Sequence, residues 1–225
     1  SMEPFLRTQL HVPTRLQDYF GWGQQTDCQF TETTTYNILQ LPFVPDEGCE
    51  QIDHALNRTI QRRLQQLEAE RGDFQARYLP QALCPLDATE ASRYISKCQA
   101  DLVLWATYER QPSEQQVMLN FQYYYRSEPN TLSQGEMTLP MSMGLLDRQQ
   151  EFIQSPVEDV VFWTRGERFF AQGEYEQAAR YYAAMRRRED SAYLPVVIRL
   201  AQCYTRTNDL ANAKAQYDWM FRIDP

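Results

Sequence analysis

The sequence predicts an α+β fold, in which a mixed β-sheet with two helices packed on it precedes an all-α segment built from a helical repeat. Between residues 36 and 141, short apolar or alternating runs are interspersed with two amphipathic helical patterns. From residue 151 onward the pattern is helical, and small and aromatic residues recur at a fixed spacing. We therefore expect three regions: an irregular lead-in over 1–35, an α/β domain over 36–150 and a helical region over 151–225.

The first strand and helix of the predicted domain have clear boundaries. Residues 36–43, YNILQLPF, are a short apolar run typical of a buried strand, and we expect Pro42 to end it. Residues 49–70 then predict an amphipathic helix, because its apolar side chains fall on one stripe. Gly72 occupies the position of a helix stop, and residues 74–79 predict a second strand. The stripe consists of Ile52, Leu56, Ile60, Leu64 and Leu67.

A second helix and three further strands complete the predicted domain. Asp87 and Glu90 have the spacing of a capping box, which predicts a helix over residues 86–99. Its predicted buried face consists of Ala91, Tyr94, Ile95 and Cys98. The nearly continuous apolar run 100–110 predicts a central strand. Residues 115–126 alternate, with Tyr124 on the wetter face, and residues 135–141 predict a fifth strand. We expect both helices to pack on one face of the sheet.

The helical region repeats itself at an offset of 35 residues. A helix start is predicted at Ser155, with Pro156 in the first turn. Beyond it, small residues recur where two helices would cross closely, and aromatic residues recur beside them. Gly173 and Asn208 fall in the two turns, at positions that favour a left-handed backbone. The matching pairs are Gly166 and Ala201, Phe169 and Tyr204, Tyr175 and Leu210, Ala178 and Ala213, and Tyr182 and Tyr217.

Residues 156–225 resemble the tetratricopeptide repeat, a helix-turn-helix unit of about 34 residues. The resemblance implies a concave groove, lined by the first helix of each repeat, that binds a peptide or a partner helix. Family members that grip a terminal carboxylate use Lys, Asn and Arg at such positions, whereas this chain has Trp163 and Ile198, so we expect a mixed apolar and polar groove. The groove positions are Trp163, Glu167, Phe170, Ile198, Gln202 and Arg206.

A competing interpretation is that these side chains pack on the preceding domain or on a third repeat. Two repeats leave a terminal helix to be covered. We therefore expect the preceding domain to cover one end and further chain to follow Pro225.

Residues 36–140 resemble, more loosely, the amino-terminal domain of TolB and the related FlgO-type domains. The strand ending in Leu41, Pro42 and Phe43 and the later run ADLVLWATYER are the basis of this resemblance. It implies a domain without a catalytic set, in which Pro42 and Phe43 have structural roles.

No enzyme motif is recognisable in the sequence. Glycine is scarce, at 8 residues, and no phosphate-binding glycine loop is present. The five cysteines, Cys28, Cys49, Cys84, Cys98 and Cys203, are far apart and lack zinc-ligand spacing. We therefore expect reduced cysteines in a cytoplasmic protein, with no catalytic residues, no metal site and no cofactor.

Charge and hydropathy exclude two classes of partner. The net charge is −8, and since residues 158–225 hold ten basic and ten acidic side chains, the excess of acid lies entirely in residues 1–157. An acidic surface argues against nucleic-acid binding, and the run of Arg186, Arg187 and Arg188 is short and followed at once by two acids. The mean hydropathy is −0.63 and no apolar run approaches the roughly 20 residues that span a bilayer.

The leading hypothesis is a non-enzymatic interaction, sensor or scaffold module of a larger bacterial signalling protein, which binds a protein or peptide through the repeat groove. The alternative is an α/β domain that senses a small molecule or is a degenerate enzyme, with a site near Pro42 and Trp105 and with repeats that serve only for assembly. Self-association through edge strands or repeat stacking is a third hypothesis.

Overall fold

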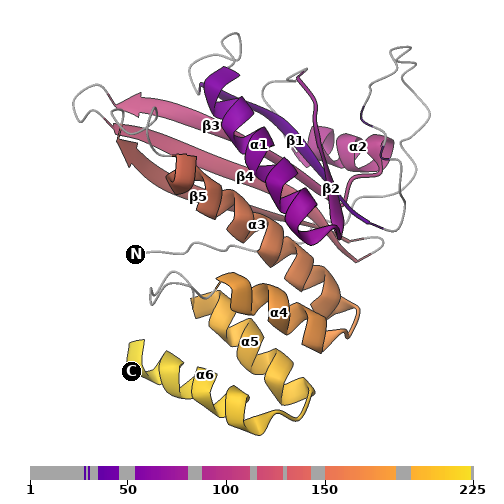
Figure 1. Ribbon diagram of the computed structural model, residues 1–225, viewed down its shortest axis with the longest axis vertical. Helices are drawn as coiled ribbons and strands as arrows, with labels where there is room; N and C mark the ends of the chain where they lie inside the picture. Colours follow the sequence, from indigo (N-terminus) through magenta and orange to yellow (C-terminus); the bar gives the residue numbers. More distant parts are fainter. Residues whose placement is uncertain are drawn as a thin grey trace. The chain divides into compact units, whose positions relative to one another are not determined.

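The chain divides into two compact units, one built mainly on residues 6–157 and one built mainly on residues 158–225 (Figure 1). The computed structural model describes residues 28, 30, 35–45, 54–80, 88–111, 116–128, 131–142, 150–185 and 194–223. The first unit holds a mixed five-stranded sheet with helices and the second a run of helices, which confirms the predicted α+β fold.

The sheet has the strand order β2-β1-β3-β4-β5. Its strands are β1 (Tyr36–Pro45), β2 (Phe74–Tyr78), β3 (Leu102–Gln111), β4 (Gln116–Glu128) and β5 (Thr131–Ser142). Strand β1 pairs in parallel with both β2 and β3, and β3 pairs antiparallel with β4. Because β1 and β3 are covered on both faces, their residues form nearly continuous apolar runs, as expected for central strands.

Helices α1 (His54–Arg71) and α2 (Ala88–Cys98) pack on opposite faces of the sheet, so the prediction of a single face was wrong. Helix α2 shares a core cluster with Leu39 and Leu41 of β1. The side chain of Gln40, between them in sequence, donates a hydrogen bond to the Asn57 carbonyl of α1 (3.4 Å), and successive strand residues point to opposite faces. The first crossover leads from β1 outward to β2, and the second leads back past β1 to β3. Right-handed connections that run in opposite directions along a sheet place their helices on opposite faces.

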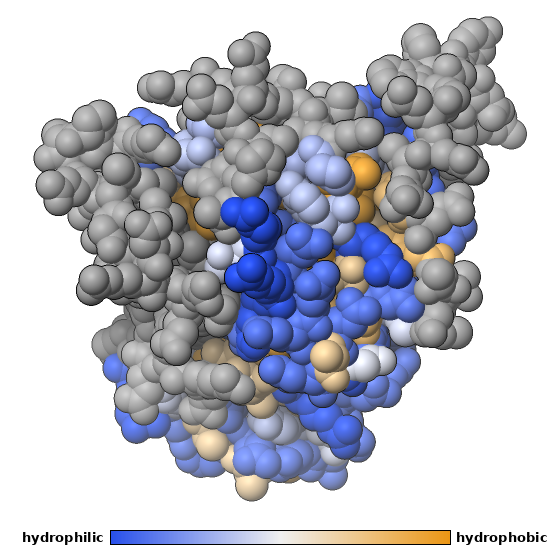
Figure 2. Space-filling model, turned by 45° about the horizontal axis from the view of Figure 1, so that its top comes forward, coloured by the Kyte–Doolittle hydropathy of each residue, from blue (hydrophilic) through white to orange (hydrophobic). Residues whose placement is uncertain are grey.

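The amphipathic pattern of α1 is confirmed. Leu56, Ile60, Leu64 and Leu67 are buried, and Gly72 ends the helix in a left-handed conformation with φ 68°. The exposed side of the helix is polar, and Figure 2 shows a surface on which the described residues are mostly hydrophilic.

Pro42 does not end the first strand, as the sequence led us to expect. Strand β1 continues to Pro45, and its register with β3 shifts between Gln40 and Phe43, where Leu41 and Pro42 of β1 lie opposite the single residue Trp105 of β3. This is a β-bulge, which accommodates a proline because the ladder is interrupted there. The side chain of Asn57 accepts a hydrogen bond from the Phe43 amide (2.9 Å) and donates one to the Phe43 carbonyl (3.1 Å). A helix side chain thus satisfies the backbone beside the bulge.

Tyr124 is buried, whereas its place in the alternating pattern of β4 predicted the wetter face. Its ring stacks on Trp105 of β3 with centroids 5.3 Å apart, and both rings belong to the cluster beneath α2. The remaining alternation of β4 is confirmed, since Leu119, Phe121 and Tyr123 are buried on the other face. The pattern failed at Tyr124 because a helix covers this face as well.

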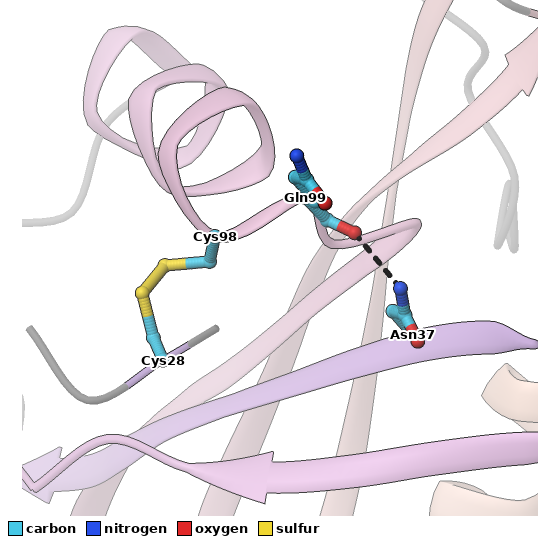
Figure 3. Close-up of a disulfide and its surroundings, with 4 residues drawn as sticks. All are labelled: Cys28, Asn37, Cys98 and Gln99. Atoms are coloured by element: carbon cyan, nitrogen blue, oxygen red, sulfur yellow. Dashed lines mark hydrogen bonds between the residues drawn. A yellow bond between two sulfur atoms is a disulfide. The ribbon is translucent and has the colours of Figure 1, made fainter. Parts of the chain in front are cut away.

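A disulfide joins Cys28 to Cys98 at the end of α2, with the two Cα atoms 5.2 Å apart (Figure 3). The expectation of reduced cysteines was therefore wrong for this pair. The expected cytoplasmic localisation was based on reduced cysteines, so it is no longer supported by them. Residue-by-residue reasoning missed the pair because cysteines separated by 70 positions in the sequence give no local signal. Cys49 and Cys84 lie outside the described residues.

The chain turns sharply after Cys98 and is held there by β1. Gln99 has a positive φ of 55°, and its carbonyl accepts a hydrogen bond from the Asn37 side chain (3.1 Å; Figure 3). Asp101 accepts a hydrogen bond from the Asn37 amide through its carboxylate (2.9 Å) and donates its own amide to the Asn37 carbonyl (2.7 Å). The turn that orients Cys98 is thus fixed to the central strand.

The helical unit consists of the latter part of α3 (Gln150–Ala171) followed by α4 (Tyr175–Met185), α5 (Leu194–Arg206) and α6 (Leu210–Ile223). Helix α3 begins at Gln150, so the predicted start at Ser155 was wrong. Pro156 lies inside the helix instead of in its first turn. A proline within a helix removes one backbone hydrogen bond without necessarily ending the helix.

The 35-residue repeat is confirmed in three dimensions at the two turns. Gly173 and Asn208 both adopt the left-handed conformation, with φ of 79° and 61°. The amide after each, from Glu174 or Asp209, donates to the carbonyl five residues earlier, at 2.9 and 2.8 Å. This is the Schellman arrangement, which satisfies the free carbonyls at a helix end.

Helices α3 and α4 approach each other closely at Gly166. A Cβ atom at Gly166 would lie 2.6 Å from the ring of Tyr182, which is fully buried. Ala178, Ala201 and Ala213, the other small residues of the repeat, are buried as well. The prediction that small residues mark close helix crossings is confirmed at Gly166.

Removing the disulfide is expected to destabilise the sheet unit. Because the Cys28–Cys98 bond closes a separation of 70 residues, replacing both cysteines by serine should lower the free energy of unfolding by about 2–4 kcal/mol. Urea denaturation followed by circular dichroism measures this change. Dithiothreitol should destabilise the native chain by a similar amount and leave the double variant unaffected. If dithiothreitol destabilises both proteins equally, its effect does not come from reduction of the Cys28–Cys98 bond.

Gly166→Ala is expected to destabilise the helical unit by about 1–2 kcal/mol, net of the higher helix propensity of alanine. The ring of Tyr182 cannot move aside cheaply, since it is buried and its hydroxyl is hydrogen-bonded. Thermal unfolding provides the measurement. Gly173→Asn is the matched control, because Asn208 occupies the same turn position in the second copy with φ 61°. Stability of Gly166→Ala equal to that of the native chain would contradict the close crossing.

Candidate functional site

The predicted groove residues of α3 and α5 differ in exposure. Trp163 and Glu167 are buried, with 6% and 5% of their surface exposed. The ring of Trp163 packs on Tyr182 of α4 with centroids 5.6 Å apart, so its side chain belongs to the core of the helical unit and not to an open surface. The other four positions reach the surface: Phe170, Ile198 and Gln202 are half-buried and Arg206 is exposed.

Glu167 is the centre of a network that joins three helices. Its carboxylate accepts two hydrogen bonds from the Arg199 guanidinium of α5, at 2.6 Å from Nε and 3.0 Å from Nη2. It also accepts one from the hydroxyl of Tyr182 on α4, at 2.8 Å. Arg199 in turn donates from Nη1 to Gln202 at 2.9 Å. A buried carboxylate is stable only with such partners, and the bidentate geometry fixes the orientation of α5 against α3.

Two arginines flank a pair of aromatic side chains beside this network. The guanidinium of Arg199 lies over the Phe170 ring, 4.5 Å from its centroid. Phe170 meets Tyr175 edge to face at 5.3 Å, and the guanidinium of Arg206 lies 6.0 Å from the Tyr175 centroid. We call these four residues the arginine–aromatic row. Cation–π contacts hold the two guanidinium groups in place.

Sequence reasoning found two members of the row, Phe170 and Arg206, and missed Arg199 and Tyr175. A signal for Arg199 existed, since an acidic residue such as Glu167 on a buried helix face requires a cationic partner. Tyr175 was assigned to the core by its place in the repeat, yet it is only half-buried.

Cys203 is a buried free thiol on α5. Burial raises its pKa to about 12, and the nearby charge of Arg199 lowers it by a smaller amount. The thiol is therefore protonated at neutral pH and is a poor nucleophile.

Among the described residues of the sheet unit, no comparable site lies near Pro42 and Trp105. Both side chains are buried, and Trp105 lies in the core cluster beneath α2. Within the described ranges, no group of three or more His, Cys, Asp and Glu residues is placed to hold a metal ion.

In the part of the chain that the structure describes, no helix combines the length and the apolar character needed to traverse a bilayer.

Comparison with known proteins supports the interpretation of the helical unit. Residues 169–219 match the family model described as tetratricopeptide repeat. No curated protein sequence matches the chain. A solved structure, described as a dodecamer of a point variant of PelC from Paraburkholderia phytofirmans, is similar over 55% of this chain and 89% of its own, with 11% identity and a TM-score of 0.34, which is too low to support an inference. The comparisons give no support to the resemblance of residues 36–140 to TolB.

The match covers the last turn of α3, the whole of α4 and α5, and most of α6. These segments hold both Schellman turns and all four residues of the arginine–aromatic row. A protein-interaction or scaffold role is consistent with such a repeat. Residues 169–219 carry a tetratricopeptide repeat, as the sequence predicts.

Proposed function

We propose that the helical unit binds a peptide or protein segment on the face formed by the arginine–aromatic row together with Ile198 and Gln202. The proposal includes the absence of catalysis: the unit recognises a partner and performs no chemistry on it. The observation that carries it is the row itself, in which two guanidinium groups stand against aromatic rings at 4.5 and 6.0 Å.

The composition of this face suits a protein partner. Arginine and aromatic side chains contribute most strongly to protein interfaces, because each combines a large contact area with a polar group. The contacts within the row limit side-chain motion before binding, which lowers the entropy lost on association. Arg199 is already neutralised by Glu167, with N–O distances of 2.6 and 3.0 Å. Arg206 is exposed, which makes it the group best placed to bind a partner carboxylate.

The partner that we expect is a segment with an apolar side chain and a nearby carboxylate. Phe170 and Ile198, both half-buried, provide apolar contact, and Gln202 provides an amide. This chemistry agrees with the mixed groove expected from the sequence. Trp163 does not contribute directly, since its side chain lies in the core.

Selection from a random peptide library displayed on phage tests the proposal. The chain is expected to enrich peptides that carry an acidic residue beside an apolar one. Arg206→Glu should weaken binding of the enriched peptides at least about tenfold, since it replaces an attraction by a repulsion. Arg180→Glu is the matched control, because Arg180 is an exposed arginine of α4 that takes no part in the row.

Fluorescence anisotropy with one labelled peptide gives the dissociation constants. Equal weakening by Arg206→Glu and Arg180→Glu would indicate a general charge effect and contradict the proposed face. Failure to enrich any peptide at this face would count against peptide binding altogether. Circular dichroism confirms that both variants fold.

The wider context remains a prediction. A sensor or scaffold role in a larger bacterial signalling protein is compatible with an interaction repeat joined to an α/β unit. The alternative is a small-molecule sensor in the sheet unit. No described residue favours this alternative over partner binding by the repeat.

A further inference from the structure

The outer face of α6 carries an apolar stripe. Among the described residues, the large apolar side chains that are exposed all lie on this helix: Leu210 (64%), Phe221 (70%) and Tyr217 (38%). With 3.6 residues per turn, these three side chains and that of Lys214 fall within roughly 60° of the helix circumference. Ala213, Gln216 and Trp219 of the same helix face inward and are buried. We call the outward set the α6 stripe.

The internal repeat shows that two of the corresponding positions of α4, Ala179 and Tyr182, are covered. Tyr182 in the first copy matches Tyr217 in the second, and Tyr182 is fully buried whereas Tyr217 is 38% exposed. Ala179, which matches Lys214, is buried as well. The α6 stripe therefore continues an interface that the first copy makes with its neighbouring helices.

The charges on the stripe indicate which surface would cover it. Lys214 stands where the covered helix α4 has an alanine, so a purely apolar helix would remove its ammonium group from water and supply no carboxylate in return. Lys214 is paired with Asp218 of its own helix at 2.6 Å, at the edge of the stripe. A suitable occupant must bring a carboxylate to Lys214 and a cation to Asp218, and it must bury three apolar side chains.

A second copy of α6 meets all three requirements. When two such helices lie antiparallel and cross at the level of Gln216, Lys214 of each copy faces Asp218 of the other, since the two residues are equally far from the crossing point. Leu210 of each copy then lies close to Phe221 of the other by the same count. We propose that the chain forms a symmetric dimer through the antiparallel pairing of its α6 stripes.

This dimer is expected to be weak. A stable interface buries about 800 Å² on each partner, which is more than three side chains of one helix supply. The association should then have a dissociation constant on the order of 100 µM. Sedimentation velocity from about 1 µM to 1 mM should show the mass rising from the 26.6 kDa of one chain towards that of two. A monomer throughout this range would overturn the proposal.

Phe221→Glu should weaken the dimer at least about tenfold, because it places a charge in the buried stripe. Ala215→Glu is the matched control, since residue 215 is exposed on the same helix but lies well away from the stripe. It should change the dissociation constant by no more than about twofold. If Phe221→Glu dimerises as well as Ala215→Glu, another surface forms the dimer and the proposal is wrong.

A mixing experiment separates the pairing between copies from the pairing within one helix. Lys214→Glu makes the stripe wholly acidic and Asp218→Lys makes it wholly basic, so each variant alone should dimerise more weakly than the native chain. An equal mixture should form a heterodimer at least as tightly as the native chain, because both contacts between copies become attractive. The pair within each helix stays broken in both variants, so a mixture that remains monomeric would overturn the antiparallel register.

Discussion

The helical unit depends on the close approach of α3 and α4 at Gly166. The glycine brings the Tyr182 ring so near that its hydroxyl reaches Glu167, at 2.8 Å, on the next residue of α3. Glu167 in turn holds Arg199 of α5 through two hydrogen bonds. A buried ion pair contributes little net stability, because desolvation offsets the attraction, but separating its partners is costly because it leaves a buried charge uncompensated. Because Gly166 has no side chain, α3, α4 and α5 can take these positions. The position of Arg199 in turn determines where the arginine–aromatic row lies.

The sheet unit is organised by a comparable constraint on its central strand. Pro42 cannot donate to the ladder, and the register shift beside it requires another partner for the backbone of Phe43, which Asn57 of α1 supplies. At the other end of the same strand, Asn37 fixes the turn that follows Cys98. Buried polar groups therefore specify where both helices attach, while the apolar stripes supply most of the driving force. The disulfide adds a covalent restraint beside the second attachment.

The sequence predicted what depends on local patterns and missed what depends on tertiary contacts. The stripe of α1, the Schellman turns at Gly173 and Asn208, and the small residues of the repeat were all readable, because each needs one residue type at one position. The bulge at Pro42 and the burial of Tyr124 could not be predicted from the sequence, since each depends on a partner that is distant in the chain. The Cys28–Cys98 pair is a long-range contact of the same kind. At the candidate site, the identity of the groove positions followed from the repeat, but their exposure did not, because Tyr182 covers Trp163.

The two copies of the repeat differ in sequence where their surroundings differ. The differences distinguish residues that pack in the core of both copies from residues that are available to bind a partner. Positions that remain small in both copies, such as Ala178 and Ala213, are buried in both. The position of Glu167 becomes Gln202 in the second copy, so a carboxylate that ties three helices together is replaced by an amide that accepts from Arg199. The position of Ala179 becomes Lys214, and a covered helix face becomes a charged and exposed one. An uncharged residue in one copy and a charged residue at the equivalent position of the other therefore indicate that the two helix faces have different neighbours. On α6 this exchange, from Ala179 to Lys214, occurs beside the exposed aromatic side chains of Tyr217 and Phe221.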